Sequence, residues 1–320
     1  MLIGEALVDC FADATVPGGA PFNVARSLGA FGIAPVMITR LGNDTPGKLL
    51  RKEFRRFGLP MDGVQTDSTR PSGQVEVTTT ATGHTFTIAE NAAWDAIDAD
   101  LARSLVDALS PSIICFGTLA QRSALSRAAV NAVLNETQAL RVLDLNLRDG
   151  ADSKEIAEWS MQSADVLKVN DVELDRLLGW FVLQPGSTAA WGSVLHLEAI
   201  AHLIAKFSLT TLVVTRGEHG YAAFDADARL VAAGEPVPTT IVDTVGAGDA
   251  FLAILILGQR LAWPIAMTLA RANLFAADVC TLRGAVADNM AFYARWATRW
   301  NLSKIAAYAA DSPSHQLTNA

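Results

Sequence analysis

Short, continuously apolar runs alternate with longer helical patterns along most of this 320-residue chain. Consecutive hydrophobic positions are typical of parallel strands that are covered on both faces. The alternation therefore predicts an α/β fold, a three-layer α/β/α sandwich with a mainly parallel central sheet. The expected strands are Pro35–Leu41, Ile113–Gly117, Arg141–Asn146, Asp165–Asn170 and Thr211–Thr215. The expected helices are Leu119–Leu140, Leu195–Ser208, Ala250–Leu261, Pro264–Leu282 and about Asp288–Trp300.

One segment departs from this pattern. Residues 73–88 read GQVEVTTTATGHTFTI, in which Val75, Val77 and Thr79 occupy alternate positions before a turn at Thr82–Gly83. Such alternation is typical of an antiparallel hairpin with one exposed face. The hairpin could be a flap over the sheet or an ordinary hairpin at its edge, and the residues leave both interpretations open.

No internal repeat and no low-complexity linker divides the chain, so the sequence predicts one domain over residues 1–311. Residues 312–320 are polar and are expected to form a frayed tail. Hydrophobic residues make up 51% of the chain and charged residues 18%. A chain this long and apolar can bury a large core, which excludes disorder as its main state.

The charge balance excludes some classes of partner. There are 25 basic and 33 acidic residues, a net charge of −8, which argues against a general nucleic-acid-binding surface. The most apolar stretch, Ala250–Leu257, is far shorter than the roughly 20 residues of a membrane span. The first residues do not resemble a signal peptide. Cys10, Cys115 and Cys280 lie far apart without a CxxC pair, so we expect reduced thiols in the cytoplasm. The five histidines form no cluster with ligand spacing, so we expect no dedicated transition-metal site.

Two glycine-containing loops are candidates for a phosphate site. Residues 42–48, GNDTPGK, have the spacing GxxxxGK, but Leu49 stands where a P-loop requires a hydroxyl for Mg²⁺. Pro46 also removes one backbone N–H from the loop. We therefore expect an ordinary strand-to-helix turn here, capped by Asn43 or Asp44.

The second loop, residues 240–251, reads TIVDTVGAGDAF and is the stronger candidate. A β-type run ends at Asp243, and Gly246 and Gly248 then lead directly into a long apolar helix. Glycines allow close backbone approach, and the first amides of a helix have no internal partners, so this turn predicts an anion site. The loop is not a GxGxxG dinucleotide fingerprint, because Phe251 stands where the third glycine belongs.

Asp249 lies in the first turn of that helix. A carboxylate there is commonly no more than a group stabilised by the helix dipole. Beside an anion site, the same carboxylate could instead accept the proton of a hydroxyl that attacks a phosphate. Phosphoryl transfer requires that pairing of a base with an anion cradle.

Other polar residues follow the predicted strands. Asp9 follows an apolar run, and Asn23 lies near the start of a helix that begins at Pro21; the two could bind hydroxyls, or Asn23 could simply be a first-turn residue. Asn170 and Glu173 stand at a strand end and could hold water around Mg²⁺ or could form a helix cap. The same ambiguity applies to residues 144–148 and 215–220. What favours a ligand site is that several such loops follow carboxyl ends of strands.

Together these segments resemble the ribokinase-like (PfkB) carbohydrate kinase family, and within it the bacterial fructokinases. The likeness runs from Gly4 to about Ala285. Its most specific element is DTVGAGDAF at 243–251, followed by GGAPFNVARSLGAFG at 18–32, and NDVE at 170–173 and TRGEHG at 215–220 are also similar. The family fold has a β-lid, which implies a lid from about 9–19 and 71–94. The segment between Asp9 and Gly18 is short, so the lid is expected to be reduced.

The resemblance implies a role for each matching residue. Asp249 is the catalytic base, with an anion hole made by the amides of Gly246, Ala247 and Gly248. The sugar is faced by Asp9, Gly18, Gly19, Asn23 and, more weakly, Arg148. Asn170 and Glu173 organise Mg²⁺ through water, and ATP is bordered by Asn170, Glu173, Thr215, Gly217, Gly220 and Asn273. A monovalent-cation site of the K⁺ type matches Asp243, Val245 and Gly284.

The function that follows is an ATP- and Mg²⁺-dependent sugar kinase that phosphorylates a hydroxymethyl oxygen. Fructose is the expected acceptor, and Gln121–Arg122 favours it by family likeness. A 2-keto-3-deoxy sugar acid or another polyol is the alternative acceptor, in which case Arg148 or Arg122 could pair with its carboxylate. A non-catalytic protein that binds nucleotide or sugar is the alternative of a different class. We expect a sugar and ATP as partners, with no nucleic acid and no membrane, and a homodimer made through the lid stays open.

Overall fold

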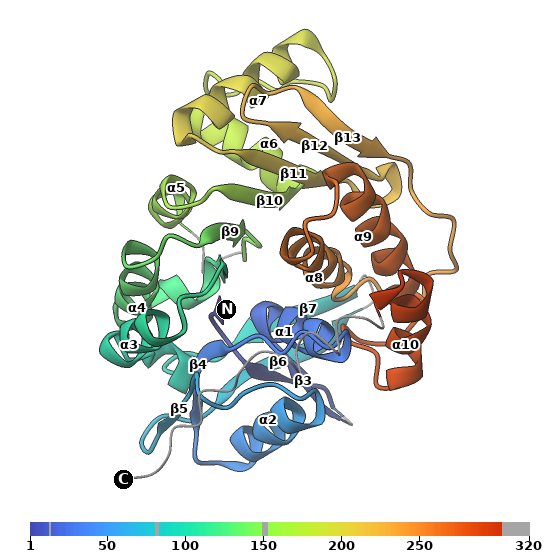
Figure 1. Ribbon diagram of the computed structural model, residues 1–320. Helices are drawn as coiled ribbons and strands as arrows, with labels where there is room; N and C mark the ends of the chain where they lie inside the picture. The colour runs from blue at the N-terminus through green and yellow to red at the C-terminus, as the bar shows by residue number, and fades with distance from the viewer. Residues whose placement is uncertain (13, 81–82, 149–152, 303–320) are drawn as a thin grey trace.

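A nine-stranded sheet forms the centre of the molecule, in the order β13-β12-β11-β10-β9-β8-β1-β4-β5 (Figure 1). The computed structural model describes residues 1–12, 14–80, 83–148 and 153–302. The strands from β11 to β5 in that order pair in parallel, and β12 and β13 are antiparallel additions at one edge. Their bounds are β1 Leu2–Ile3, β4 Met37–Gly42, β5 Val64–Asp67, β8 Ile113–Gly117, β9 Leu140–Asp144, β10 Val166–Asn170, β11 Thr211–Thr215, β12 Tyr221–Asp225 and β13 Leu230–Gly234.

Helices cover both faces of this sheet, as the continuous apolar runs predict. In β11, Leu212 and Val214 belong to one hydrophobic core and Val213 to the other, and all three side chains are fully buried. One face carries α3 Ala99–Leu109, α4 Ala124–Asn135, α5 Lys154–Gln162, α6 Asp171–Phe181 and α7 Val194–Phe207. The other carries α1 Ala20–Ala30, α2 Thr45–Arg56, α8 Ala247–Arg260, α9 Ile265–Val279 and α10 Met290–Arg299. The three-layer α/β/α prediction is confirmed (Figure 1).

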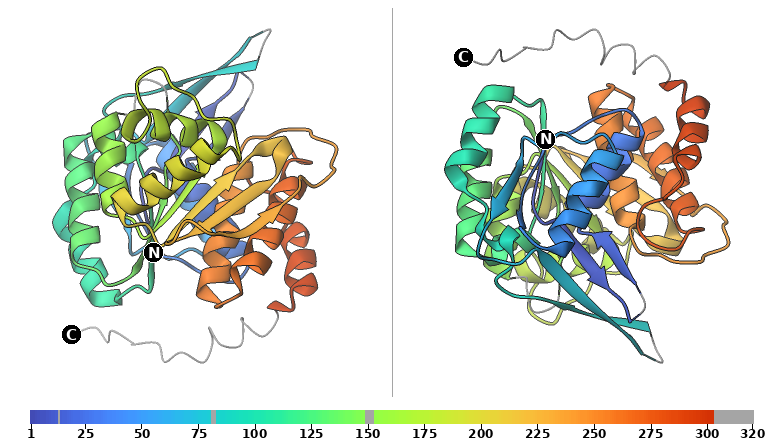
Figure 2. Two further views of the ribbon diagram at one scale, coloured as in Figure 1. Left: turned by 90° about the horizontal axis from the view of Figure 1, so that it is seen from above. Right: turned by 90° about the horizontal axis from the view of Figure 1, so that it is seen from below.

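A second, four-stranded sheet, here called the lid sheet, has the order β3-β2-β6-β7. Its strands are β2 Leu7–Cys10, β3 Thr15–Gly18, β6 Gly73–Thr80 and β7 Gly83–Ile88. The expected hairpin is therefore β6–β7, and it belongs to this separate sheet rather than to the edge of the central one; residues 81–82 of its turn lie outside the described residues. Figure 2 shows the hairpin reaching out from the body of the molecule. The short connection after Asp9 still allows β2 and β3 to pair antiparallel, with Asp9 opposite Val16.

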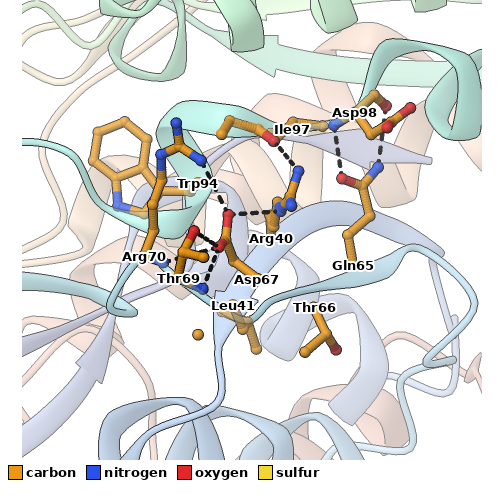
Figure 3. A network of polar contacts seen from close by, with 12 residues as sticks. Arg40, Leu41, Gln65, Thr66, Asp67, Thr69, Arg70, Trp94, Ile97 and Asp98 are labelled. Carbon is orange, nitrogen blue, oxygen red and sulfur yellow. Dashed lines mark hydrogen bonds and ion pairs between the residues drawn. The ribbon is translucent and has the colours of Figure 1, made fainter.

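A polar network braces the place where the chain passes from β5 of the central sheet towards β6 of the lid sheet (Figure 3). The buried Asp67 carboxylate accepts hydrogen bonds from the amides of Thr69 and Arg70, at 2.8 Å each, and forms an ion pair with Arg40 at 3.0 Å. Burial alone would raise the pKa of Asp67, but these donors outweigh it and hold the pKa well below its usual range. Arg40 also donates to the backbone oxygen of Ala96, just after β7, which ties both connections of the hairpin to β4.

The GxxxxGK segment forms the expected capped turn. Asp44 is the N-cap of α2, and its side chain accepts from the amide of Gly47 at 2.8 Å. The same carboxylate accepts from the amide and the hydroxyl of Ser72, beside the start of β6. These bonds occupy both carboxylate oxygens, so the segment anchors the lid sheet.

Two expected elements are wrong. The helix predicted over Leu119–Leu140 is a short 3₁₀ turn, Leu119–Arg122, followed by α4, and Leu140 already belongs to β9. The β-type run that ends at Asp243 is irregular backbone, with the amides of Val242 and Asp243 bonded to the oxygen of Cys280. Ile241 and Val242 are exposed, as the side chains of a buried strand would not be. The predicted tail, residues 312–320, and residues 303–311 lie outside the described residues.

Across the residues that the structure describes, we find no helix long and apolar enough to cross a bilayer.

Candidate active site

The glycine-rich turn at the start of α8 lies beside the carboxyl edge of the parallel strands. Gly246 is the N-cap of α8 and has a φ of +78°, a conformation that favours glycine, and a Cβ there would collide with the backbone of Ala285. No side chain caps the helix. The amide of Ala247 makes a 3.2 Å bond to the oxygen of Thr244 within the turn, so of the three predicted amides this one is partly engaged.

Asp249, in the first turn of α8, is hydrogen-bonded to α1. The Asn23 Nδ2 donates to Asp249 Oδ2 at 2.7 Å, although the two residues are 226 positions apart in the sequence. Two glycines allow close packing where the lid sheet leads into α1: a Cβ on Gly18 would strike the Asp9 carboxylate, and one on Gly19 would lie 2.7 Å from the backbone oxygen of Glu5. Asp9, Gly18, Gly19, Asn23, Arg148 and Asp249 are here called the lid side of the site.

Carboxyl groups crowd the lid side, and withdrawal from water raises their pKa values. Burial raises the pKa of Glu5 to about 7 and that of Asp9 to about 6, while the charge of Arg148 lowers both. Burial and the neighbouring Asp144 raise the pKa of Asp249, against the opposing effect of its hydrogen bond with Asn23. An exposed Arg148 therefore lies close enough to act on all three groups, and Asp249 has the raised pKa that suits a general base.

A buried ion pair lies under the glycine turn. Lys168, on β10, donates from Nζ to Asp144 Oδ1 at 2.9 Å, and each side chain is only 7% exposed. Burial alone would lower the pKa of Lys168, but the Asp144 charge outweighs it and raises the pKa. A Cβ on Gly248 would lie 3.0 Å from Lys168 Nζ, so the ammonium group stands directly behind the start of α8.

Asn170 and Glu173 form the helix cap that was one of their two interpretations. Asn170 caps α6 by accepting from the amide of Glu173, and Glu173 Oε2 accepts from the amide of Asn170, both at 2.8 Å. Glu173 Oε1 accepts from the amide of Leu147 at 2.8 Å. Glu173 thus ties the loop after β9 to the end of β10, whatever further role it has. Burial, followed by the charge of Asp144, raises its pKa.

The other predicted nucleotide residues stand further along the same edge. Thr215 ends β11 directly beside Asn170, and it donates to the oxygen of Val169 at 3.3 Å. Gly217 and Gly220 border the turn between β11 and β12, with φ values of +51° and +76°. Asn273, on α9, donates to the oxygen of Glu235 at 2.9 Å. Asn170, Glu173, Thr215, Gly217, Gly220 and Asn273 are here called the loop side of the site.

The structure also brings the residues of the predicted monovalent-cation site together. Asp243 Oδ1 accepts from the amide of Val245 at 3.0 Å, and Asp243 Oδ2 accepts from the amide of Gly284 at 2.9 Å. The carboxylate therefore joins the turn before α8 to the turn after α9.

Comparison with known proteins decides the family. The sequence profile described as "pfkB family carbohydrate kinase" matches residues 4–291. The chain belongs to this family. It is a PfkB-type sugar kinase, an enzyme that transfers a phosphoryl group, so the family resemblance seen in the motifs is confirmed.

Relatives and solved structures agree with the family. The chain is 29% identical over 263 residues to fructokinase-2 of Solanum habrochaites, covering 79% of this chain and 75% of that protein. It is 27% identical over 275 residues to a fructokinase of Klebsiella pneumoniae, covering 80% and 83%. The fold is similar to that of a Xylella fastidiosa fructokinase solved with bound ATP, with a TM-score of 0.76, 22% identity, and coverage of 94% and 98%.

Three charged residues next to the site were not among the sequence predictions: Glu5, Arg26 and Lys168. Lys168 had a visible signal, because it interrupts the apolar run VLKVN of a predicted buried strand. Arg26 had a weaker one, since it lies within the helix whose apolar stripe includes Val24 and Leu28. A charge in a buried stripe must find a partner, and here the partners come from the site.

Proposed function

We propose that this PfkB-type kinase transfers the γ-phosphoryl group of ATP to a hydroxymethyl oxygen of fructose. The observation that carries the proposal is the Asp249 carboxylate, which Asn23 holds by a hydrogen bond at the start of α8, where no side chain caps the helix. A carboxylate with a raised pKa can accept the proton of an attacking hydroxyl. The helix start offers backbone amides to the phosphoryl oxygens as charge develops on them.

The two sides of the site take different parts of the reaction. Asp9, Asn23 and Arg148 would bind the hydroxyls of the sugar, because short carboxylate and amide groups pair well with hydroxyl groups. The amides of Gly246, Ala247 and Gly248 would receive the phosphoryl group. Thr215, Gly217, Gly220 and Asn273 would border the nucleotide, at the strand ends where α/β sheets bind ligands. Lys168 would add positive charge behind the phosphoryl position.

The residues present fit Mg²⁺ that arrives with the nucleotide. Where side chains are described, no three His, Cys, Asp or Glu residues form a metal-binding group. Mg²⁺ keeps several waters and is commonly held through one or two carboxylates and the phosphates of the substrate. Glu173 and Asn170 would hold such waters, and the buried Asp144 Oδ2, which has no hydrogen-bond partner, is a further acceptor. When bound, Mg²⁺ neutralises phosphate charge during transfer. Asp243, Val245 and Gly284 would hold K⁺.

The charges around the acceptor position favour a neutral sugar over a sugar acid. Glu5 and Asp9 each lie close enough to Asp249 for the charge of Asp249 to raise their pKa values, so a substrate carboxylate brought to Asp249 would meet repulsion from the same group. Arg122, one of the two arginines considered for a sugar acid, already makes two 2.8 Å bonds to Asp95. Its guanidinium also lies 4.2 Å from the ring centre of Trp94. Arg148 keeps the sugar acid as a second candidate, because its charge reaches Asp9 and Asp249.

The test is ADP release from Mg²⁺ and ATP with a panel of sugars that includes fructose and 2-keto-3-deoxygluconate. We expect fructose to give the highest kcat/KM. A higher value for the sugar acid, lost in Arg148→Gln, would support the second candidate instead. ATP binding without ADP release in the presence of any sugar would support the non-catalytic alternative.

A further inference from the structure

Arg26 is a buried arginine on the inner face of α1, next to the proposed base. Its residue surface is 5% exposed, and its guanidinium lies 4.8 Å from the ring centre of Phe22 and 5.8 Å from that of Phe57. Burial lowers the pKa of Arg26 to about 10, which leaves it charged at neutral pH. A buried charge is costly unless it is hydrogen-bonded, so the acceptors of Arg26 indicate what the buried arginine does.

The Arg26 bonds lead directly to Asp249. Arg26 Nη2 donates to Asn23 Oδ1 at 2.6 Å, and Asn23 Nδ2 donates to Asp249 Oδ2 at 2.7 Å. A guanidinium only donates and a carboxylate only accepts, so the asparagine amide between them has one favourable orientation. If the amide were turned over, its oxygen would face the carboxylate and its NH₂ group would face the guanidinium. Arg26 thereby fixes which end of Asn23 faces Asp249.

The same nitrogen also reaches the lid sheet. Arg26 Nη2 donates to the backbone oxygen of Pro17 at 2.7 Å, and Pro17 lies in β3, paired with Val8 of β2. Asp9, which would bind the sugar, is the next residue of β2. One guanidinium nitrogen therefore joins a lid strand to the side chain that holds the base.

We propose that Arg26 is a positioning residue that orients the Asn23 amide, holds Asp249 Oδ2, and links this arrangement to strand β3 of the lid sheet. Asp249 Oδ1 is then the oxygen left to accept the proton of the sugar hydroxyl. The inference deepens the proposed function and rests on it. It goes further in naming a residue that touches neither sugar nor nucleotide but sets the geometry of the base.

Other charged groups also act on Asp249, so the test must separate them from Arg26. They face it from several elements: Glu5 after β1, Asp9 on β2, Asp144 on β9, Arg148 after β9 and Lys168 on β10. The experiment keeps all of these unchanged and varies only Arg26 and Asn23.

The first variant is Arg26→Met, which keeps an unbranched apolar chain between Phe22 and Phe57 but has no donor. We expect kcat to fall about tenfold or more, because the charge-assisted hydrogen bond from Arg26 to Asn23 is lost. We also expect the acidic limb of the kcat–pH profile to move upward by about half a unit to one unit, because Asn23 then donates less well to Asp249 and the positive charge of Arg26 near Asp249 is removed. A purely structural role would lower the melting temperature and leave this limb in place.

Asn23→Ala and the double variant test whether Arg26 acts through Asn23. Asn23→Ala should move the acidic limb in the same direction, and Arg26→Met should add little to that shift in the Asn23→Ala background. Full additivity of the two shifts would overturn the inference. Arg51→Met is the matched control: Arg51 donates to the backbone oxygen of Gly42 and to Thr66 but has no bond to Asn23, so its acidic limb should match the native one.

Arg26→Lys covers the case in which Arg26→Met does not fold. Lysine keeps the positive charge, but its shorter reach does not allow one ammonium group to serve both Pro17 and Asn23. We expect this variant to melt close to the native protein and still to show the raised acidic limb; a native limb would overturn the inference. The outcome for the proposed function is separate, because it depends on Asp249→Ala. If Asp249→Ala is inactive but Arg26→Met keeps the native pH profile, the role of Arg26 is refuted and the proposed function still stands.

Discussion

On the lid side of the site, side chains from distant parts of the chain bond to one another, whereas on the loop side each polar side chain bonds to backbone. Asn23 reaches across 226 positions to Asp249, through side-chain atoms at both ends. Glu173, by contrast, accepts from the amides of Asn170 and Leu147, and Asn273 donates to the oxygen of Glu235. A substitution on the lid side therefore removes a reacting or orienting group, whereas a substitution on the loop side releases a piece of backbone.

The largest expected effect tests the lid side. Asp249→Ala removes the proposed base, and we expect turnover to fall by about 10²–10⁴. The melting temperature should stay near the native value. Burial raises the pKa of Asp249, which means that the fold disfavours its charged form, and its side chain does not cap α8. ADP release and thermal unfolding measure the two effects.

Asp98→Ala is the matched control, because Asp98 caps α3 through the amides of Asp100 and Leu101. It should lower stability by about 1 kcal/mol and keep turnover. If Asp249→Ala kept its turnover, the assignment of the base would be wrong.

The second effect compares two glycines of the same turn. Gly246→Ala forces a side chain into a φ of +78° against the backbone of Ala285, and we expect a loss of stability of about 1–3 kcal/mol. Gly248→Ala would place its methyl group 3.0 Å from Lys168 Nζ, the end of a flexible side chain, so we expect a smaller loss of stability. We also expect a loss of activity, because the methyl group displaces the ammonium group behind the start of α8. Equal losses of stability in the two variants would contradict the assignment of a structural role to Gly246 and a role in activity to Gly248.

The third effect tests the loop side. Glu173→Gln replaces one carboxylate oxygen with an NH₂ group, so it can no longer accept from both Asn170 and Leu147. We expect KM for ATP to rise about tenfold, with a smaller change in kcat, as the loop after β9 is released. Glu155→Gln, at an exposed first-turn position of α5, should leave both constants unchanged. A large fall in kcat at constant KM would instead show that Glu173 acts in the phosphoryl-transfer step, as the lid-side residues are proposed to do.

The smallest effect concerns Glu5. Its pKa of about 7 lies above the ordinary value of 4.5, so the unfolded chain ionises first and the stability that Glu5 provides is lost as pH rises from about 4.5 to about 7. Glu5→Gln should therefore melt higher than the native protein at pH 8 and at the same temperature at pH 4.5. A difference of the opposite sign at pH 8 would show that the charged form of Glu5 is stabilised in the fold.

Local patterns predict the elements that satisfy themselves locally. The apolar run around Val213 predicts a buried strand because both faces of that strand must be covered, and the caps at Asp44 and Asn170 join residues only three positions apart. The run before Asp243 has the same β-type composition, yet it is irregular, and the amides of Val242 and Asp243 bond to the oxygen of Cys280 instead of to a strand. Composition describes what a segment can do, and pairing partners decide what it does.

The candidate site divides in the same way. The glycine turn, Asp249 and the motif around Asn170 are visible as short patterns, and family resemblance supplies their proposed roles. Lys168 and Arg26 appear in the sequence only as charges within apolar stripes. Their acceptors, Asp144 and Asn23, become apparent when strands and helices are placed side by side.

Periodicity and turn chemistry act over a few residues, so the layered α/β architecture, the family and the glycine-rich start of α8 can be predicted from the residues alone. That the β6–β7 hairpin joins a separate lid sheet, and that Arg26 connects this sheet to Asp249 through Asn23, becomes apparent only in the folded chain. A hydrogen bond between side chains depends on distance and direction in space, and neither is encoded in the separation of two residues along the chain.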